Sequence, residues 1–225
     1  MTLSHVVDAA FDAGLDLAAT TAVGRYNQAV DHPYRLPGRD DRTVLVLGNT
    51  AAIWPHIGLW AEAGNDRDPV DTYVESAVAA ASTLGPAVID IRYSHEPPPR
   101  RIAIQRLAHI AGLAWLSPSH LCVHPVFGPW IALRAAIVLD TAHSDPARPM
   151  SPPCACEDHC LPYLEAAVTP GVPENRAELE AGWQRRLAVR DACPVGREHR
   201  YSDEQIRYHY AGIRPSSWPP SDPLR

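Results

Sequence analysis

The run IALRAAIVLD at residues 131–140 shows the clearest alternation in the chain, and the fold class follows from it. An apolar side chain occupies every second position, which is the period of a strand with one face in a core; these residues are Ile131, Leu133, Ala135, Ile137 and Leu139. Working outward from this run, three shorter apolar stretches also predict strands: TVLVLGN at 43–49, AVIDIRY at 87–93 and HLCVH at 120–124.

Helices are predicted between these strands. Ser4 can cap a first helix whose apolar face repeats every four residues, at Val7, Phe11 and Leu15. Asp68-Pro69 predicts the start of a second helix, with Asp68 as its cap. A third carries apolar residues at Ala103, Leu107, Ile110 and Ala114. The last third reads as helix and loop, with helices near 156–167 and 174–191 and a short one capped by Ser202 and Gln205.

This order of elements predicts an α+β fold with a helical C-terminal extension. We expect one domain over residues 1–212. Residues 141–153 contain four prolines and no long apolar run, which indicates a crossing loop within that domain. The tail at 213–225 is expected to be flexible.

Composition excludes several classes of function. The chain has 225 residues, a formal net charge of -6 and no lysine, so a nucleic-acid binder, which needs a basic face, is not expected. No segment reaches the ~18 to 20 apolar residues of a membrane span. The N-terminal residues lack the basic start and apolar core of a signal peptide, so we expect a cytoplasmic protein without membrane contact.

The segment CVHPVFGPW at 122–130 is the first candidate site. Strand alternation puts Cys122 and His124 on one face and Val123 on the other. Gly128 lets the backbone approach a flat ligand closely, and Phe127 and Trp130 offer wide rings to pack against it. The alternative is a hairpin turn with core aromatic side chains.

Four cysteines form the second candidate site. Cys154, Cys156 and Cys160 lie within seven residues, and Cys193 lies further on. In a cytosolic protein, such a set suggests a zinc or iron–sulfur site before disulfides. The spacing differs from the regular cysteine run of ferredoxins, and a group of surface thiols is the alternative.

Arginines provide the third candidate set. Because every basic residue is arginine, anions must be bound by guanidinium groups. Arg190 and Arg200 belong to an arginine-rich stretch that can bind carboxylate or phosphate, unless it is a solvated helix face. Arg134 lies on a sheet face between alanines, where a guanidinium needs a partner or a ligand. Glycine-rich dinucleotide and phosphate loops and the common hydrolase motifs are absent from the sequence.

Together, seven collinear blocks between about residues 23 and 210 resemble the CblC family of cobalamin-processing proteins, the cyanocobalamin decyanases and alkylcobalamin dealkylases. The blocks are VGRYNQAV with YRLPG (23–38), TVLVLGNTAAIW (43–54), DPVDTYVESAV (68–78), AHIAGLAW (108–115), CVHPVFGPWIALRA (122–135), LAVRDA (187–192) and HRYSDEQIRYHY (199–210). The resemblance implies a flavin-nitroreductase-like fold, with a mixed sheet flanked by helices, that holds cobalamin with its dimethylbenzimidazole tail detached from cobalt.

The resemblance also implies roles for individual residues. The cavity for cobalamin would be lined by the segment Cys122, Val123, His124, Pro125, Phe127, Gly128 and Trp130. Arg134, Arg190 and Arg200 would position a thiol co-substrate such as glutathione, and His109 would lie near the upper axial ligand. Reduced flavin is a further possible source of electrons, and a protein that accepts the processed cobalamin is an expected partner. The chain would be a monomer or a homodimer.

Three departures from the family pattern qualify this interpretation. The stretch WLSPSH at 115–120 is short where animal members carry an insertion. The four cysteines at 154, 156, 160 and 193 are not part of the animal pattern, although cobalamin-dependent epoxyqueuosine reductases combine a related fold with iron–sulfur clusters. The lysine-free composition suggests a bacterium, in which another thiol can replace glutathione.

We therefore predict a cobalamin-binding protein that removes the upper axial ligand. One alternative is a carrier of cobalamin without turnover. Another is a cobalamin-dependent reductase in which the four cysteines hold a metal or an iron–sulfur cluster.

Overall fold

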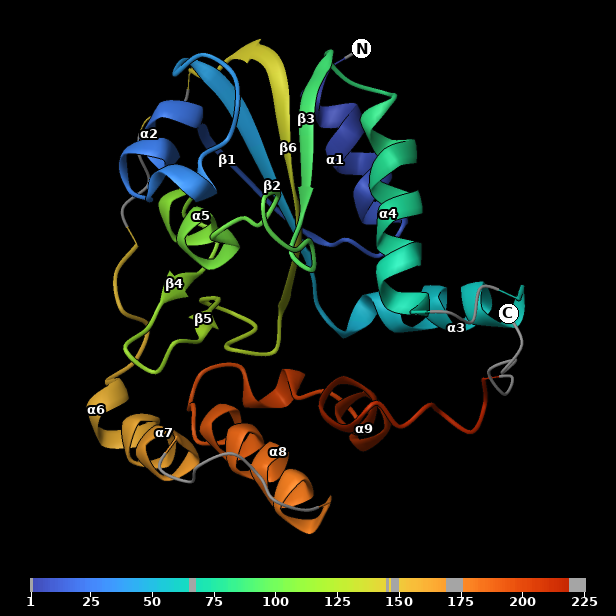
Figure 1. The fold of residues 1–225 in the computed structure, drawn as a ribbon, viewed down its shortest axis with the longest axis vertical. Helices are drawn as coiled ribbons and strands as arrows, with labels where there is room; N and C mark the ends of the chain where they lie inside the picture. Colours follow the sequence, from blue (N-terminus) through green and yellow to red (C-terminus); the bar gives the residue numbers. More distant parts are fainter. Residues whose placement is uncertain (1, 65–67, 145, 147–149, 169–175, 219–225) are drawn as a thin grey trace. The chain divides into compact units, whose positions relative to one another are not determined.

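The computed structural model describes residues 2–64, 68–144, 146, 150–168 and 176–218. The chain forms two compact units (Figure 1). Unit 1 comprises Met1–Leu113, Ala132–Met150 and Ser217–Arg225, and unit 2 comprises Ala114–Ile131 and Ser151–Ser216. The region predicted as one domain thus contains two units, and the chain passes from unit 1 to unit 2 at 150/151, inside the predicted crossing loop at 141–153.

Unit 1 is built on a four-stranded sheet. The strands are β1 (Leu17–Ala22), β2 (Arg42–Asn49), β3 (Val88–Tyr93) and β6 (Ala132–Ala142), in the order β1-β2-β6-β3. Every pairing is antiparallel, so the predicted mixed sheet is wrong. Apolar periodicity identifies a strand but carries no information on the direction of its neighbours, which explains the error.

Helices cover both faces of this sheet. In Figure 1, α1 (Leu3–Asp12) and α4 (Pro69–Ser82) lie on one side, and α2 (Val23–Gln28) and α5 (Ile104–Ile110) lie on the other. β2 and β6 are therefore buried on both faces, and Val44, Leu45, Val46 and Leu47 have no exposed surface. The remaining helical segments of this unit are the short turns η1 (His32–Tyr34) and η2 (Ala51–Ile53), and helix α3 (Trp54–Glu62).

Unit 2 contains mostly helices. Its strands β4 (Trp115–Leu116) and β5 (Cys122–Val123) form a two-stranded antiparallel pair, so the strand predicted over 120–124 is shorter than expected. The helices are α6 (Cys156–His159), α7 (Leu161–Val168), α8 (Arg176–Asp191), η3 (Arg197–His199) and α9 (Asp203–Ala211).

Three local predictions are wrong. The first concerns the apolar face of α1: Phe11 is 44% exposed, and the buried side chains of this helix are Val6 and Ala10. The helix ends before Leu15, so Leu15 does not belong to its face. Asp68 precedes α4 in a left-handed conformation and makes no side-chain cap. Trp218, in the predicted flexible tail, is buried with its ring 4.9 Å from that of Trp54, because burial of a large aromatic surface fixes this part of the chain. Residues 219–225 lie outside the described residues.

Among the described residues, no helix has both the length and the apolar composition needed to span a bilayer.

Candidate functional site

His124 is fixed by a tight turn in unit 2. The backbone N–H groups of His124 and Gly128 each donate to the other residue's carbonyl oxygen, at 2.8 and 2.9 Å. The N–H groups of Val126 and Phe127 donate to His124 Nδ1 at 3.1 and 3.2 Å. Because Nδ1 accepts hydrogen bonds, the proton of the neutral imidazole lies on Nε2, and the ring presents a donor there.

Gly128 has a structural role that differs from the predicted one. Its φ is +57°, and a Cβ added there would lie 1.9 Å from the carbonyl oxygen of Val195. Gly196, with φ +66°, faces the backbone of Phe127 and Gly128 in the same way. Two backbone segments therefore cross in contact at these glycines. The close approach that the structure shows at Gly128 is to the chain itself, and its contact with a flat ligand stays a prediction.

Trp130 lies against Arg190 and Tyr201. The Arg190 guanidinium carbon is 4.9 Å from the centroid of the Trp130 ring and 5.3 Å from that of Tyr201, and Trp130 is 1% exposed. Arg190 Nη2 donates to the carbonyl oxygens of Pro129 and Ile131. These ring and carbonyl contacts let Arg190 hold the end of the 122–130 segment in place, although its buried Nε has no hydrogen-bond partner among the described residues.

Arg200 lies near the same ring but is more accessible. Its guanidinium carbon is 5.6 Å from the Trp130 centroid, and its side chain is 37% exposed. Arg200 Nε donates to Asp191 at 2.7 Å and Nη1 donates to Asp203 at 3.0 Å. These carboxylates, Asp191 first, raise the pKa of Arg200 above its ordinary value. The structure thus brings Arg190 and Arg200 together at Trp130.

The other two predicted catalytic residues belong to unit 1. Arg134, on β6, donates from Nε to Asn49 Oδ1 at 2.7 Å, at the end of β2. Asn49 is 2% exposed and is held in turn by its own bond to the Thr50 carbonyl oxygen at 2.7 Å. Asn49 is therefore one partner of this guanidinium, through its Nε. His109 lies half-buried in the last turn of α5.

The residues predicted to line the cobalamin cavity differ in accessibility. Val123 is fully buried in the core of unit 2, and Cys122 and Trp130 are 8% and 1% exposed. Burial raises the pKa of the Cys122 thiol to about 12. The side chain of Val123 packs against the cysteine-containing core, and its lining role stays a prediction. The side chains of His124, Pro125 and Phe127 are exposed or half-exposed.

Sequence reasoning did not assign roles to Tyr201 and Asn49. Tyr201 is 4% exposed and contacts both Trp130 and Arg190, and Asn49 positions Arg134. Tyr201 lies in the block at 199–210, next to Arg200, and Asn49 lies in the block at 43–54, at the end of a predicted strand. These positions were the available signals for the two residues.

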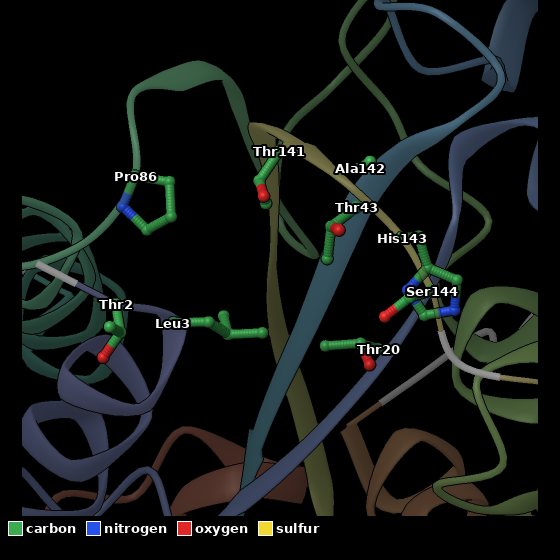
Figure 2. Close-up of a pocket in the computed structure, with 9 residues that line it drawn as sticks. All are labelled: Thr2, Leu3, Thr20, Thr43, Pro86, Thr141, Ala142, His143 and Ser144. Carbon is green, nitrogen blue, oxygen red and sulfur yellow. The ribbon is translucent and has the colours of Figure 1, made fainter.

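A separate cavity of about 370 Å³ lies in unit 1 (Figure 2). Hydroxyl groups of Thr20, Thr43, Thr141 and Ser144 line it, and His143 lies beside them. None of the predicted site residues borders it. Its volume suits a small ligand, whereas a corrin with its nucleotide tail is far larger, so this cavity is not a candidate for cobalamin.

The four predicted cysteine ligands come together in unit 2. Cys156, Cys160 and Cys193 are 4%, 0% and 0% exposed, and Cys154 packs against the same core at its edge. Cys154 Sγ and Cys156 Sγ are 3.7 Å apart, and the Cys160 thiol contacts those of Cys156 and Cys193. Burial and the neighbouring thiols raise the pKa of Cys160 to about 12 and raise that of Cys154 as well. Among the described residues, no group of three or more His, Cys, Asp or Glu side chains has the arrangement needed to hold a metal ion.

Comparison with known proteins shows two curated relatives and several similar structures. The chain is 28% identical over 212 residues to a cyanocobalamin reductase / alkylcobalamin dealkylase of Danio rerio, a match that covers 83% of this chain and 79% of that protein. It is 29% identical over 163 residues to the protein of the same name from Mus musculus, covering 63% of this chain and about half (53%) of that protein. No family model matches the chain.

Solved structures show the same relationship at the level of the fold. A B12-trafficking CblC protein of C. elegans has a TM-score of 0.65 and 21% identity, and the match covers 94% of this chain and 90% of that one. An epoxyqueuosine reductase from Bacillus subtilis has a TM-score of 0.52 at 10% identity, covering 93% and 75%. The resemblance found in the sequence is confirmed: this chain is similar to the CblC proteins in sequence and in fold.

Proposed function

We propose that this chain binds cobalamin as its substrate, with the dimethylbenzimidazole tail detached, and removes the upper axial ligand. The observation that carries this proposal is the sequence similarity to the Danio rerio cyanocobalamin reductase / alkylcobalamin dealkylase over most of both chains. The fold shared with the C. elegans CblC protein supports it.

The proposed chemistry depends on the upper ligand. To remove an alkyl group, a thiolate attacks the carbon bound to cobalt, so that a sulfur–carbon bond forms while the cobalt–carbon bond breaks and its electron pair stays on cobalt. To remove cyanide, an electron from a reduced flavin or a thiol reduces cobalt, and cyanide leaves as the anion. The chain positions the reactants and excludes competing ones, and cobalt carries the bond changes.

The residues divide these tasks according to their surroundings. Arg200 is the best candidate to bind a carboxylate of the thiol co-substrate, because its guanidinium is partly exposed; the co-substrate would compete with Asp191 and Asp203, which already pair with it. Arg190 acts through the turn that it holds. His124, with its proton on Nε2, and Phe127 offer a donor and an apolar ring to the substrate.

Spectroscopic titration tests this function directly. We would add methylcobalamin and cyanocobalamin separately to the anaerobically purified protein and record ultraviolet–visible spectra. A blue shift to the spectrum of cobalamin with its tail detached is the expected result. Unchanged spectra at micromolar protein would rule out the proposal.

A second step separates an enzyme from a carrier. Thiol or reduced flavin is added to the same cuvette, and turnover appears as conversion of the bound species to reduced cobalamin. Binding without conversion by any of several thiols or by flavin would favour the carrier.

A further inference from the structure

The cysteine cluster is a set of thiol side chains that the proposed function does not use. It brings together two distant parts of unit 2, the segment around α6 and the residue that follows α8. The Cys160 N–H donates to the Cys156 carbonyl oxygen at 3.0 Å, so these two residues lie one helical turn apart on the same face. Cys193 lies two residues after the end of α8, and its N–H donates to the Arg190 carbonyl oxygen at 3.1 Å.

We propose that Cys154, Cys156, Cys160 and Cys193 bind a single tetrahedral divalent metal ion of the zinc type. On binding, the four thiols lose their protons to solvent, and four metal–sulfur bonds form without any change of oxidation state. The contacts already run in a series from Cys154 through Cys156 and Cys160 to Cys193. Closing the series around the ion requires rotation of these side chains, because no group of described residues has the arrangement of a metal site as it stands.

The spacing of the sulfur atoms favours this kind of site. Zinc–sulfur bonds of about 2.3 Å in a tetrahedron place neighbouring sulfur atoms about 3.8 Å apart. Cys154 Sγ and Cys156 Sγ are 3.7 Å apart. The four thiolates of a [4Fe–4S] cluster bind different irons and are held apart by the cluster. Thiols in mutual contact therefore favour a single ion over an iron–sulfur cluster.

The surroundings also define the ligand set. His159 is close to the cysteines in sequence but is an exposed residue of α6, so we do not include its imidazole among the ligands. The four thiols complete a tetrahedral set without it. Val123, Val189 and Leu164 pack around the cluster and exclude water from it. Four thiolates with a divalent ion carry a net charge of -2, and Arg197, whose Nε donates to the Cys193 carbonyl oxygen at 3.3 Å, places a positive charge nearby.

Elemental analysis of protein purified without chelators tests the proposal. We expect about one zinc ion per chain in the wild type and a loss of most of it in Cys160→Ser and Cys193→Ser. Cys122→Ala is the matched control, because Cys122 is a buried cysteine of the same unit outside the cluster; it should keep the metal. These metal measurements do not depend on cobalamin. The metal site can therefore be ruled out while the proposed cobalamin processing stands, and cobalamin processing can be ruled out while the metal site stands.

A second variant and a second probe keep the test informative if Cys160→Ser or Cys193→Ser fails to fold. Cys154 lies at the half-exposed edge of the cluster, so Cys154→Ser should fold and still lose most of the metal. Reconstitution with cobalt(II) should give the intense thiolate charge-transfer bands and ligand-field bands of a tetrahedral ion in the wild type, and weaker bands in Cys154→Ser.

Two outcomes would overturn the proposal. One is a wild-type protein that binds no stoichiometric metal even after reduction and addition of zinc. The other is iron with inorganic sulfide in cluster stoichiometry, which would establish the iron–sulfur alternative.

Discussion

At the scale of single residues, the crossing of Gly128 and Gly196 makes the sharpest structural demand. Gly128→Ala would combine a left-handed φ with a Cβ 1.9 Å from a backbone oxygen that cannot move aside without moving its loop. We expect a loss of about 3 kcal/mol or more in the free energy of unfolding. Urea unfolding followed by fluorescence measures it.

A matched control for this variant exists in the same unit. Gly212 has φ +66° but nothing within 4 Å of its added Cβ, so Gly212→Ala isolates backbone strain at about 1 kcal/mol. Equal losses in the two variants would mean that the contact with Val195 contributes nothing.

Cys122 makes a prediction about pH. Its pKa is near 9.0 in the unfolded chain and about 12 when folded, because burial disfavours the thiolate. Between these pH values the folded state binds more protons than the unfolded state, so stability falls as the pH rises from 9 toward 12. Cys122→Ala should reduce this fall by up to about 1.4 kcal/mol per pH unit. Urea unfolding at pH 8, 9 and 10 measures it, and an identical slope in both proteins would contradict the burial argument.

At the scale of elements, α9 shows a prediction that local sequence can support fully. The Gln205 N–H donates to Ser202 Oγ at 3.2 Å, and the Ser202 N–H donates to Gln205 Oε1 at 3.0 Å, which closes the predicted capping box. Ser202→Ala should lower the free energy of unfolding by about 1 kcal/mol, whereas Ser202→Thr keeps the hydroxyl and most of the stability. Hydrogen exchange of the α9 amides is the measurement, and unchanged protection in Ser202→Ala would contradict it.

Other elements show what sequence leaves out. Periodicity identified β2, β3 and β6 to within two residues, because their burial follows from apolar side chains. It missed β1, whose sequence LAATTA has no strong apolar alternation and is stabilised by pairing with β2. It also gave no sign of the backbone contact at Gly128, since the partner backbone comes from residues almost 70 positions away. A local sequence pattern carries no information on contacts between residues so far apart in the chain.

At the scale of the whole molecule, the predicted functional residues are distributed over both units. His109 and Arg134 belong to unit 1, and His124, Arg190 and Arg200 belong to unit 2. The resemblance to the CblC family grouped these residues into one candidate site. Composition and spacing alone could not have done so. The structure then assigns each arginine a different environment, and those environments predict different consequences of substitution.

Arg190→Ala removes a cation from between two aromatic rings and two carbonyl groups. We expect it to lower the stability of unit 2 by about 2 kcal/mol or more and to weaken cobalamin binding, because the 122–130 segment loses its support. Arg200→Ala breaks ion pairs at a partly exposed side chain, which contribute only about 0 to 1 kcal/mol to stability. Its effect should fall on thiol-dependent turnover, at about 10- to 100-fold, while cobalamin affinity stays close to that of the wild type.

Stopped-flow turnover and spectroscopic titration of the two variants, run side by side, separate these effects. If Arg200→Ala turns over at the wild-type rate with saturating and with limiting thiol, Arg200 does not position the co-substrate, and Arg134 becomes the next guanidinium to substitute. If both variants lose affinity and turnover in parallel, the two arginines share a structural role around Trp130. A rate loss confined to Arg200→Ala, with binding retained, is the pattern that an enzyme produces and that a carrier cannot.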